Sequence, residues 1–275
     1  MNIIKIMGGL GNQLFQYAFG RAQQENGLQV AFDNSFYGTS EDKPPLRHKK
    51  WPRFYRLNKF HTFIPLNPIN PKLPTLKEAN GPLDMSLLKK HPYNFDGYWQ
   101  YPAYTRDILP LLREEFRLNP EFITKACKEV IGQMLDSNSV SIHVRRGDYV
   151  FQKGFYNLPF RYYLEAIAVC PGDHLFIFSD DIPWCKKLFL PEYFKRKITF
   201  VEGFEDYQDF EMMKYCKHHV IANSTMSYWV AYLEDRQDSV IVVPSGWTSG
   251  ARELNQIERM KEVDKLYYDE SWIKI

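Results

Sequence analysis

Hydrophobic positions along the chain follow two periods, one typical of strands and one typical of helices. Val140, Ile142 and Val144 alternate with polar residues, as one face of a buried strand does. Similar short apolar runs predict strands over residues 3–6, 28–32, 140–145, 175–178, 198–201, 219–222 and 240–243. Amphipathic stretches between them predict helices over residues 12–25, 106–117, 120–135, 159–170, 182–190, 206–216 and 225–233. Strands that alternate with helices imply parallel sheets, so the predicted fold class is α/β.

A polar, turn-rich segment at residues 136–139 separates two such α/β halves. We expect a first domain over residues 1–137 and a second over residues 138–275. Between residues 38 and 104 the periodic pattern is lost, because prolines crowd this segment together with basic and aromatic residues. We expect an irregular insertion with short helices there, which serves either as an acceptor-binding surface or as a cap over the first sheet.

Net charge, cysteine spacing and the length of apolar runs argue against several classes of protein. A net charge of +2 over 275 residues is too small to indicate nucleic acid as a partner. The four cysteines form no C-x-x-C pair, which argues against a zinc site and favours free thiols in a reducing compartment. The N-terminus lacks the apolar region of a signal peptide, and no apolar run reaches the roughly 20 residues of a membrane span. We therefore expect a cytoplasmic protein, with peripheral attachment to the inner face of the cell membrane left open.

The strand at residues 140–145 ends in two adjacent arginines. Gly147 and Asp148 break the strand directly after them, so Arg145 and Arg146 are expected where the strand meets its exit loop. Ligands of open α/β sheets bind at this carboxyl end, and a planar guanidinium matches the oxygens of a phosphate in a bidentate pair. These residues predict a pyrophosphate site. The alternative is a structural ion pair between arginine and aspartate.

A glycine-rich loop, Gly8-Gly9-Leu10-Gly11-Asn12, joins the first strand to the first helix. Its backbone N–H groups suit an anion at a helix N-terminus, with Asn12 as the expected helix cap. The loop resembles the dinucleotide fingerprint G-x-G-x-x-G, but Leu14 stands where the third glycine belongs. Asp33 occupies the place of a ribose-binding acid, so an NAD-dependent oxidoreductase is one alternative here.

Two further polar triplets follow strands. Asn223-Ser224-Thr225 either offers hydroxyl and N–H groups to a phosphate or caps the next helix. Ser179-Asp180-Asp181 has three interpretations: paired carboxylates that hold a metal, an acceptor for the N–H groups of a guanine base, or a helix cap.

Three histidines lie near these stretches. His143 shares the phase of Arg145 along the strand, and it either contacts a nucleotide or is a buried structural residue. His218 and His219 lack the i, i+4 spacing of metal ligands on a helix, and we interpret them as structural.

Three motifs span nearly the whole chain in order. They are residues 8–18, which read GGLGNQLFQYA, residues 143–149, which read HVRRGDY, and the segment from Phe210 to Trp229, which contains NSTMSYW. Together they resemble the bacterial α-1,2-fucosyltransferases of glycosyltransferase family 11. The resemblance implies a GT-B-like fold, in which two Rossmann-like domains with parallel sheets face each other across a cleft. It also implies GDP-β-L-fucose as donor, inversion at the anomeric carbon, and no divalent metal or other cofactor.

The same resemblance implies roles for individual residues. Arg145 would stabilise the β-phosphate of the leaving GDP, with Arg146 and Asp148 shaping its site. No carboxylate is singled out by position as the catalytic base, and Asp148 is interpreted as orienting the arginine. The remaining donor contacts would come from His143 and from Asp180 or Asp181 to the guanosine, from Ser224 and Thr225 to phosphate oxygens, and from Gly9, Gly11 and Asn12 of the opposite domain, with Asn12 toward the reacting centre.

The leading hypothesis is therefore a galactoside 2-α-L-fucosyltransferase that acts on a galactose-terminated oligosaccharide or glycolipid. The alternatives are a fucosyltransferase of another linkage, a non-catalytic nucleotide-binding or glycan-binding module, and the NAD-dependent oxidoreductase. We expect the insertion between residues 38 and 104 to select the acceptor.

Overall fold

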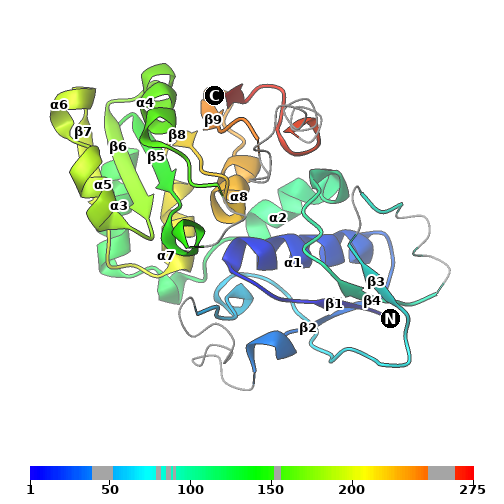
Figure 1. Cartoon of the computed structure of the whole chain (residues 1–275). Coiled ribbons are helices and arrows are strands. Elements are labelled where there is room, and N and C mark those ends of the chain that lie inside the picture. Colours follow the sequence, from blue (N-terminus) through cyan, green and yellow to red (C-terminus); the bar gives the residue numbers. More distant parts are fainter. Residues whose placement is uncertain (39–51, 79–81, 85–87, 89–90, 152–155, 247–263) are drawn as a thin grey trace. The chain divides into compact units, whose positions relative to one another are not determined.

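Both halves of the chain fold around a parallel β-sheet. The computed structural model describes residues 1–38, 52–78, 82–84, 88, 91–151, 156–246 and 264–275 (Figure 1). Parts of the expected insertion, such as residues 39–51 and 79–81, lie outside the described residues. The chain divides into two units, Met1–Asn119 and Pro120–Ile275, with one parallel sheet in each. The predicted α/β class, with a parallel sheet in each half, is confirmed, and the GT-B-like arrangement of the two halves stays a prediction.

The first unit contains a four-stranded sheet in the order β2-β1-β4-β3, and every neighbouring pair is parallel. In chain order its strands and α-helices are β1 (Asn2–Lys5), α1 (Leu10–Glu25), β2 (Val30–Asp33), β3 (Thr75–Lys77), β4 (Asn94–Asp96) and α2 (Leu109–Glu115). Its described 3₁₀ turns are Ser35–Tyr37, Leu57–Lys59, Pro102–Tyr104 and Arg106–Ile108.

Helix α1 lies along one face of this sheet (Figure 1). Leu14 and Phe19 of its predicted apolar stripe are fully buried. The helix ends as predicted, with Gly27 just beyond it at a φ of 80°. Helix and sheet approach so closely at Gly20 that a Cβ there would lie 2.5 Å from Phe32 Cε1.

Strands β3 and β4 lie inside the segment for which the sequence predicts no strands, so that prediction is wrong at these two places. Each has three residues, too few for an alternating period to be recognised. Phe95 stabilises β4, because its ring is fully buried and lies 5.3 Å from the ring of Phe19. The insertion therefore completes the first sheet.

The second unit contains a six-stranded sheet in the order β10-β9-β8-β5-β6-β7, again with parallel neighbours. Its strands and α-helices are α3 (Lys125–Leu135), β5 (Ser139–Val144), α4 (Phe160–Val169), β6 (His174–Ser179), α5 (Ile182–Leu188), α6 (Pro191–Phe194), β7 (Lys197–Val201), α7 (Asp206–Met213), β8 (His218–Val220), α8 (Thr225–Leu233), β9 (Ile241–Val243) and β10 (Ile273–Lys274). Its described 3₁₀ turns are Pro120–Phe122 and Gly147–Val150. Every strand and helix predicted for residues 120–275 is present, and α6 and β10 are additions that are too short to be recognised in the sequence.

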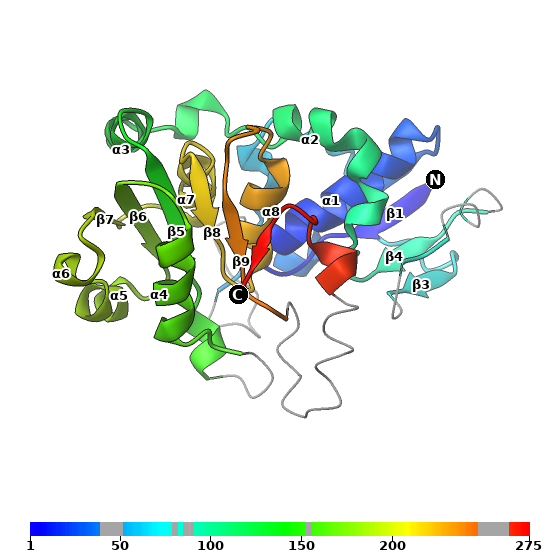
Figure 2. The same ribbon diagram turned by 90° about the horizontal axis from the view of Figure 1, so that it is seen from above.

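Helices cover both faces of this sheet (Figure 2). Helices α4 and α5 share one hydrophobic core with Val140, Ile142 and Val144, the apolar face predicted for β5. Helices α3, α7 and α8 lie on the other face (Figure 2), and right-handed crossovers from β7 to β8 and from β8 to β9 require this face for α7 and α8.

The division between the units falls after residue 119, ahead of the boundary expected at residue 137. Helix α3 and the 3₁₀ turn before it belong to the second unit because they pack against α7. Gln208 Nε2 donates to the Phe122 carbonyl over 2.9 Å, and the rings of Phe122 and Tyr207 are 5.8 Å apart. Periodicity shows that a helix has an apolar face but not which neighbour covers it.

The structure bears on two expectations from composition, one about the cysteines and one about membrane-spanning helices. The cysteines at 127, 170, 185 and 216 are buried and free, as predicted. Among the described helices, none combines the length and apolar character needed to cross a bilayer.

Candidate functional site

The strand order of the second sheet reverses between β5 and β8. From β5 the chain continues to β6 and β7 on one side, then returns to β8, β9 and β10 on the other. In such sheets, ligands bind outside the carboxyl ends of the strands at the reversal. Three predicted stretches lie at this edge: residues 143–148 with β5, 179–181 with β6 and 223–225 after β8. The fold therefore brings together segments that are far apart in the sequence.

Arg145 is held at this edge by two carboxylates and an aromatic ring. Its Nη2 donates to Asp148 Oδ1 and its Nη1 to Asp180 Oδ2, while the guanidinium carbon lies 5.1 Å from the centre of the Tyr149 ring. A guanidinium has five N–H donors, so these two bonds leave others for a ligand. The side chain is 21% exposed. The ion pair that the sequence leaves as an alternative is present, and it orients the arginine without enclosing it.

Asp180 is shared between the arginine and the backbone that follows it. Its Oδ1 accepts from the amide of Arg146 over 2.8 Å and from the amide of Gly147 over 3.0 Å. A Cβ at Gly147 would collide with Asp180 Oδ2 and lie 3.0 Å from its Cγ, so glycine is needed for this approach. Both oxygens of Asp180 are engaged within the protein, and its contact with a guanosine stays a prediction.

Arg146 has a different set of partners. Its Nε donates to Asp181 Oδ2 over 2.9 Å, and its guanidinium carbon lies 4.1 Å from the centre of the Trp184 ring. Asp181 Oδ1 also accepts from the Trp184 amide over 3.2 Å, so Asp181 caps α5, one of the alternatives for this triplet. Arg146 therefore anchors the exit loop of β5 to α5. Sequence reasoning missed Trp184, whose only signal is its place in the first turn of a helix after a strand-end aspartate.

Ser224 and Thr225 begin α8 at the strand reversal. Ser224 occupies the N-cap position, yet its side chain makes no capping hydrogen bond. In contrast, the side chains of Thr124 and Asp181 do cap α3 and α5. The helix-cap alternative for this triplet is therefore not realised by the Ser224 side chain, and its contact with a phosphate stays a prediction.

His143 is a neutral, buried side chain close to the end of β5. It is 4% exposed. Burial, and then the positive charge of Arg145, lower the pKa of His143 to about 3, so the imidazole is uncharged at neutral pH. Its Nδ1 is buried and makes no hydrogen bond within the described residues, which leaves that atom for a ligand. The predicted nucleotide contact stays a prediction.

The glycine-rich loop lies at the carboxyl edge of the first sheet. Helix α1 has Gly9 at its N-cap, so Asn12 lies inside the first turn and the prediction that it caps the helix is wrong. Asn12 Oδ1 instead accepts from Gln100 Nε2 over 2.9 Å. Gly8 has a φ of 86°, and a Cβ there would lie 2.7 Å from Asn12 Nδ2. Gly11 is buried within α1, and the donor contacts of Gly9, Gly11 and Asn12 stay predictions.

Asp33 closes the turn after β2. Its Oδ1 accepts from the Ser35 amide over 3.0 Å and its Oδ2 from the Ser35 hydroxyl over 3.1 Å. Both oxygens of the Asp33 carboxylate therefore bind Ser35. The aspartate that favoured an NAD-dependent oxidoreductase thus has a structural explanation.

His218 and His219 link strand β8 to its neighbours. His219 Nδ1 pairs with Ser141 Oγ at 2.7 Å, and its Nε2 pairs with Glu234 Oε2 at 3.0 Å. His218 Nε2 pairs with Asn138 Oδ1 at 3.0 Å. Both histidines have the structural role that the sequence indicates.

The second unit should lose stability in acid because of Glu234. Burial alone would raise the pKa of Glu234, but hydrogen bonds from His219 and Arg236 outweigh burial and lower it from 4.5 to about 2. A carboxylate whose pKa is lower in the folded state contributes stability above its unfolded-state pKa, and this is lost as the pH falls through the folded value. We expect the loss of about 3 kcal/mol as this carboxylate titrates.

Denaturant unfolding at neutral and acidic pH measures this contribution. Glu234→Gln should be less stable than the wild type at neutral pH and should lose less stability on acidification. Glu165→Gln, which removes an exposed partner of Arg161 on α4, is the matched control and should leave the pH dependence unchanged. Identical pH profiles for the wild type and Glu234→Gln would contradict the assignment.

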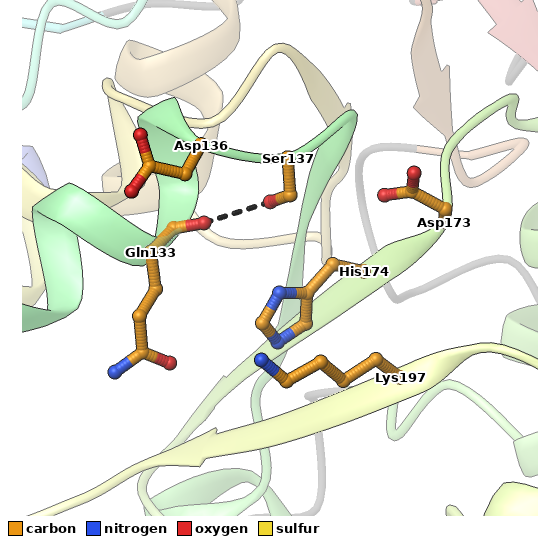
Figure 3. Close-up of a pocket in the computed structure, with 6 residues that line it drawn as sticks. All are labelled: Gln133, Asp136, Ser137, Asp173, His174 and Lys197. Atoms are coloured by element: carbon orange, nitrogen blue, oxygen red, sulfur yellow. Dashed lines mark hydrogen bonds between the residues drawn. The ribbon is translucent and has the colours of Figure 1, made fainter.

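One further feature lies apart from the strand reversal. A polar hollow of about 400 Å³ lies at the opposite, amino edge of the second sheet (Figure 3), lined by Gln133, Asp136, Ser137, Asp173, His174 and Lys197. Burial, and then the charge of Lys197, lower the pKa of His174 to about 4.

Across the part of the chain that the structure describes, no three His, Cys, Asp or Glu side chains gather as a metal site. The expectation of metal independence stays a prediction.

The protein is an α/β protein in which two carboxylates hold an arginine at the strand reversal of a parallel sheet, and such proteins bind their ligands at this reversal. A sequence model of glycosyl transferase family 11 matches residues 83–273. The chain belongs to this family, which confirms the family resemblance of its motifs.

Two relatives and one solved structure resemble this chain to different degrees. An α-1,2-colitosyltransferase of Escherichia coli is 31% identical over 304 residues, which cover 99% of this chain and 98% of that protein. A mouse (Mus musculus) protein named galactoside 2-α-L-fucosyltransferase Sec1 is 28% identical over 160 residues, covering 52% of this chain and 42% of its own. The crystal structure of POFUT1 in complex with GDP superimposes with a TM-score of 0.47 at 14% identity, covering 87% of this chain and 98% of the other.

Proposed function

We propose that the protein is an inverting glycosyltransferase that moves L-fucose from GDP-β-L-fucose to the 2-hydroxyl of a terminal galactoside. The acceptor is a galactose-terminated oligosaccharide or glycolipid. Family membership supports sugar transfer, and the names of the Escherichia coli and mouse relatives support the linkage. The observation that carries the proposal is the position of Arg145.

We infer that Arg145 compensates the charge on the departing diphosphate. In the proposed reaction, the acceptor oxygen attacks the anomeric carbon from the face opposite the β-phosphate. The bond between that carbon and the phosphate oxygen breaks, and its electron pair remains on GDP. The acceptor hydroxyl gives up its proton as the new bond forms. A guanidinium that is already oriented stabilises the growing negative charge without having to rearrange, which makes such groups effective catalysts.

Asp148 and Asp180 act as positioning residues in this scheme. Each accepts one hydrogen bond from the arginine fork, so the guanidinium has little freedom to turn. The Asp148 side chain is 5% exposed, which suits it to holding the arginine and not to taking a proton from an acceptor. We assign Ser224 and Thr225 to the phosphate oxygens and His143 to the nucleoside.

Donor choice is open between two related sugars, because the Escherichia coli relative is named for colitose. Colitose differs from fucose by the absence of the 3-hydroxyl. A site that hydrogen-bonds a hydroxyl with buried groups rejects an analogue without that hydroxyl by roughly 10⁴-fold or more in kcat/KM. The kcat/KM values for the two donors should therefore differ strongly. We expect GDP-fucose to have the higher kcat/KM.

The test is transfer to lactose from each donor, with GDP release and the product linkage measured by NMR. GDP-fucose should yield a product fucosylated at the 2-position of galactose, and maltose, which has no galactose, should not be an acceptor. The rate should be unchanged by EDTA, since Arg145 provides the charge that a metal would otherwise supply. A higher kcat/KM for GDP-colitose would reassign the donor. Another linkage, no transfer, or a metal requirement after chelation would contradict the proposal.

A further inference from the structure

Three loops of the first unit meet at the carboxyl edge of its sheet. They are residues 6–9 after β1, Glu78 after β3 and residues 97–100 after β4, and the three strands lie side by side (Figure 1). Ligands of parallel sheets bind at this edge. Tyr98 lies in the last of these loops and is 39% exposed, so its aromatic ring reaches solvent at a place where a ligand is expected.

The backbone around Tyr98 is held from several sides. Glu78 Oε2 accepts from the Tyr98 amide over 2.7 Å, and Glu78 Oε1 accepts from the Gln100 amide over 3.2 Å. Gln16 Nε2 donates to the carbonyl of Gly97 over 3.0 Å. The carboxylate of one loop and the amide of α1 thus fix the conformation of another loop.

Trp99 adopts a strained conformation that depends on these contacts. Its φ is 56°, which is unusual for a residue other than glycine. Its ring is buried and stacks on Phe19 at 4.6 Å with an interplanar angle of 8°. Strain of this kind persists where the surroundings over-determine the backbone, and it gathers at ligand sites. The buried Trp99 anchors the loop while its neighbour Tyr98 remains exposed.

Groups suited to a sugar surround the exposed ring. A Cβ at Gly8 would lie 3.3 Å from Tyr98 Cε1, so bare backbone faces the ring there. The amides of Asn12 and Gln100 pair at 2.9 Å beside this loop. An aromatic ring offers a large apolar face at small entropic cost, and a few fixed polar groups give orientation. A pyranose has the complementary surfaces, with an apolar C–H face and a rim of hydroxyl groups.

We propose that Tyr98 is the platform on which the galactose ring of the acceptor stacks, with the Asn12–Gln100 amide pair beside its hydroxyl groups. This site deepens the proposed function and rests on it. We assign the acceptor to it because Arg145, Ser224 and Thr225, which we assign to the diphosphate, all belong to the second unit. A nucleoside base also stacks on aromatic rings, so the experiment separates acceptor from donor.

The experiment measures KM for lactose and for GDP-fucose separately. Tyr98→Ala should raise the lactose KM about tenfold or more and leave the GDP-fucose KM within about twofold, since loss of a stacking ring removes ground-state contact with the acceptor. Tyr98→Phe, which keeps the ring, should restore most of the lactose affinity. Tyr193→Ala, which removes an exposed tyrosine from α6, should change neither constant. Thermal unfolding checks that each variant folds.

Saturation-transfer NMR with lactose and methyl β-D-galactoside provides a readout that does not depend on turnover. Protons of the galactose ring should receive saturation from the wild type and much less from Tyr98→Ala. An unchanged lactose KM in Tyr98→Ala, a change confined to the GDP-fucose KM, or no saturation transfer to either galactoside would overturn the inference. A wild type that binds galactosides through Tyr98 but transfers no sugar from GDP-fucose would instead contradict the proposed function.

Discussion

Arg145→Ala should lower the kcat of sugar transfer by about a hundredfold or more. Loss of one well-placed donor to a developing anion typically costs 10²–10³ in kcat, and Arg145 is the oriented cation at the strand reversal of the second sheet. Arg145→Lys should recover little of the activity, because an ammonium keeps the charge but not the two-point fork that Asp148 and Asp180 hold. Initial rates at saturating donor and acceptor measure the effect.

Stability needs its own control in this experiment. The variant leaves the nearly buried carboxylate of Asp148 without its cation, so some loss of stability is expected. Arg145→Lys retains a cation and should unfold closer to the wild type. Arg161→Ala, which removes an exposed arginine paired with Glu165 in the same unit, should leave kcat unchanged. Near-normal kcat in a folded Arg145→Ala protein would contradict the proposed role of Arg145 in stabilising the departing diphosphate.

Gly147→Ala should be nearly as damaging, although this residue offers no side chain to a ligand. A methyl group at this position would meet Asp180 Oδ2 and lie 3.0 Å from Cγ, so the carboxylate must withdraw. Asp180 would then lose its bonds to the amides of Arg146 and Gly147 and its pair with Arg145. A displacement of about 1 Å at a reacting centre can cost roughly a hundredfold in rate, and we expect a loss of this order in kcat.

A second glycine provides the matched control. Gly132 lies within α3, and a Cβ there would meet nothing within 4 Å. Gly132→Ala should keep full activity and gain about 0.5–1 kcal/mol of stability from the better helix former. If Gly147→Ala lowers kcat by displacing Asp180, the double variant Gly147→Ala/Asp180→Ala should have a kcat no lower than that of the more damaging single variant. Full additivity, or an active Gly147→Ala, would show that Asp180 does not set the position of Arg145.

The two adjacent arginines show where sequence reasoning stops. Both follow the same strand and look equivalent as phosphate ligands. In the fold, Arg145 joins Asp148 and Asp180, while Arg146 stacks on Trp184. The two residues are adjacent in the sequence, and only the folded neighbours on each side decide which partners hold each arginine.

The first motif gives a second example. Its two glutamines, Gln13 and Gln16, bond to backbone of the first unit. Gln13 Nε2 donates to the Phe54 carbonyl over 2.7 Å, and Gln13 Oε1 accepts from the Arg56 amide over 2.8 Å. The motif therefore shapes loops at the carboxyl edge of the first sheet, and no local pattern reveals the segments to which its side chains bond.

By itself the sequence determined the α/β class, the central strand with its terminal arginines and the family of the chain, because these depend on local periodicity and on contiguous motifs. Only the tertiary structure decided that β3 and β4 complete the first sheet, that α3 belongs to the second unit, and that two aspartates hold Arg145. Each of these depends on partners far away in the chain. Packing and hydrogen bonding between distant segments select one partner among many that local chemistry allows.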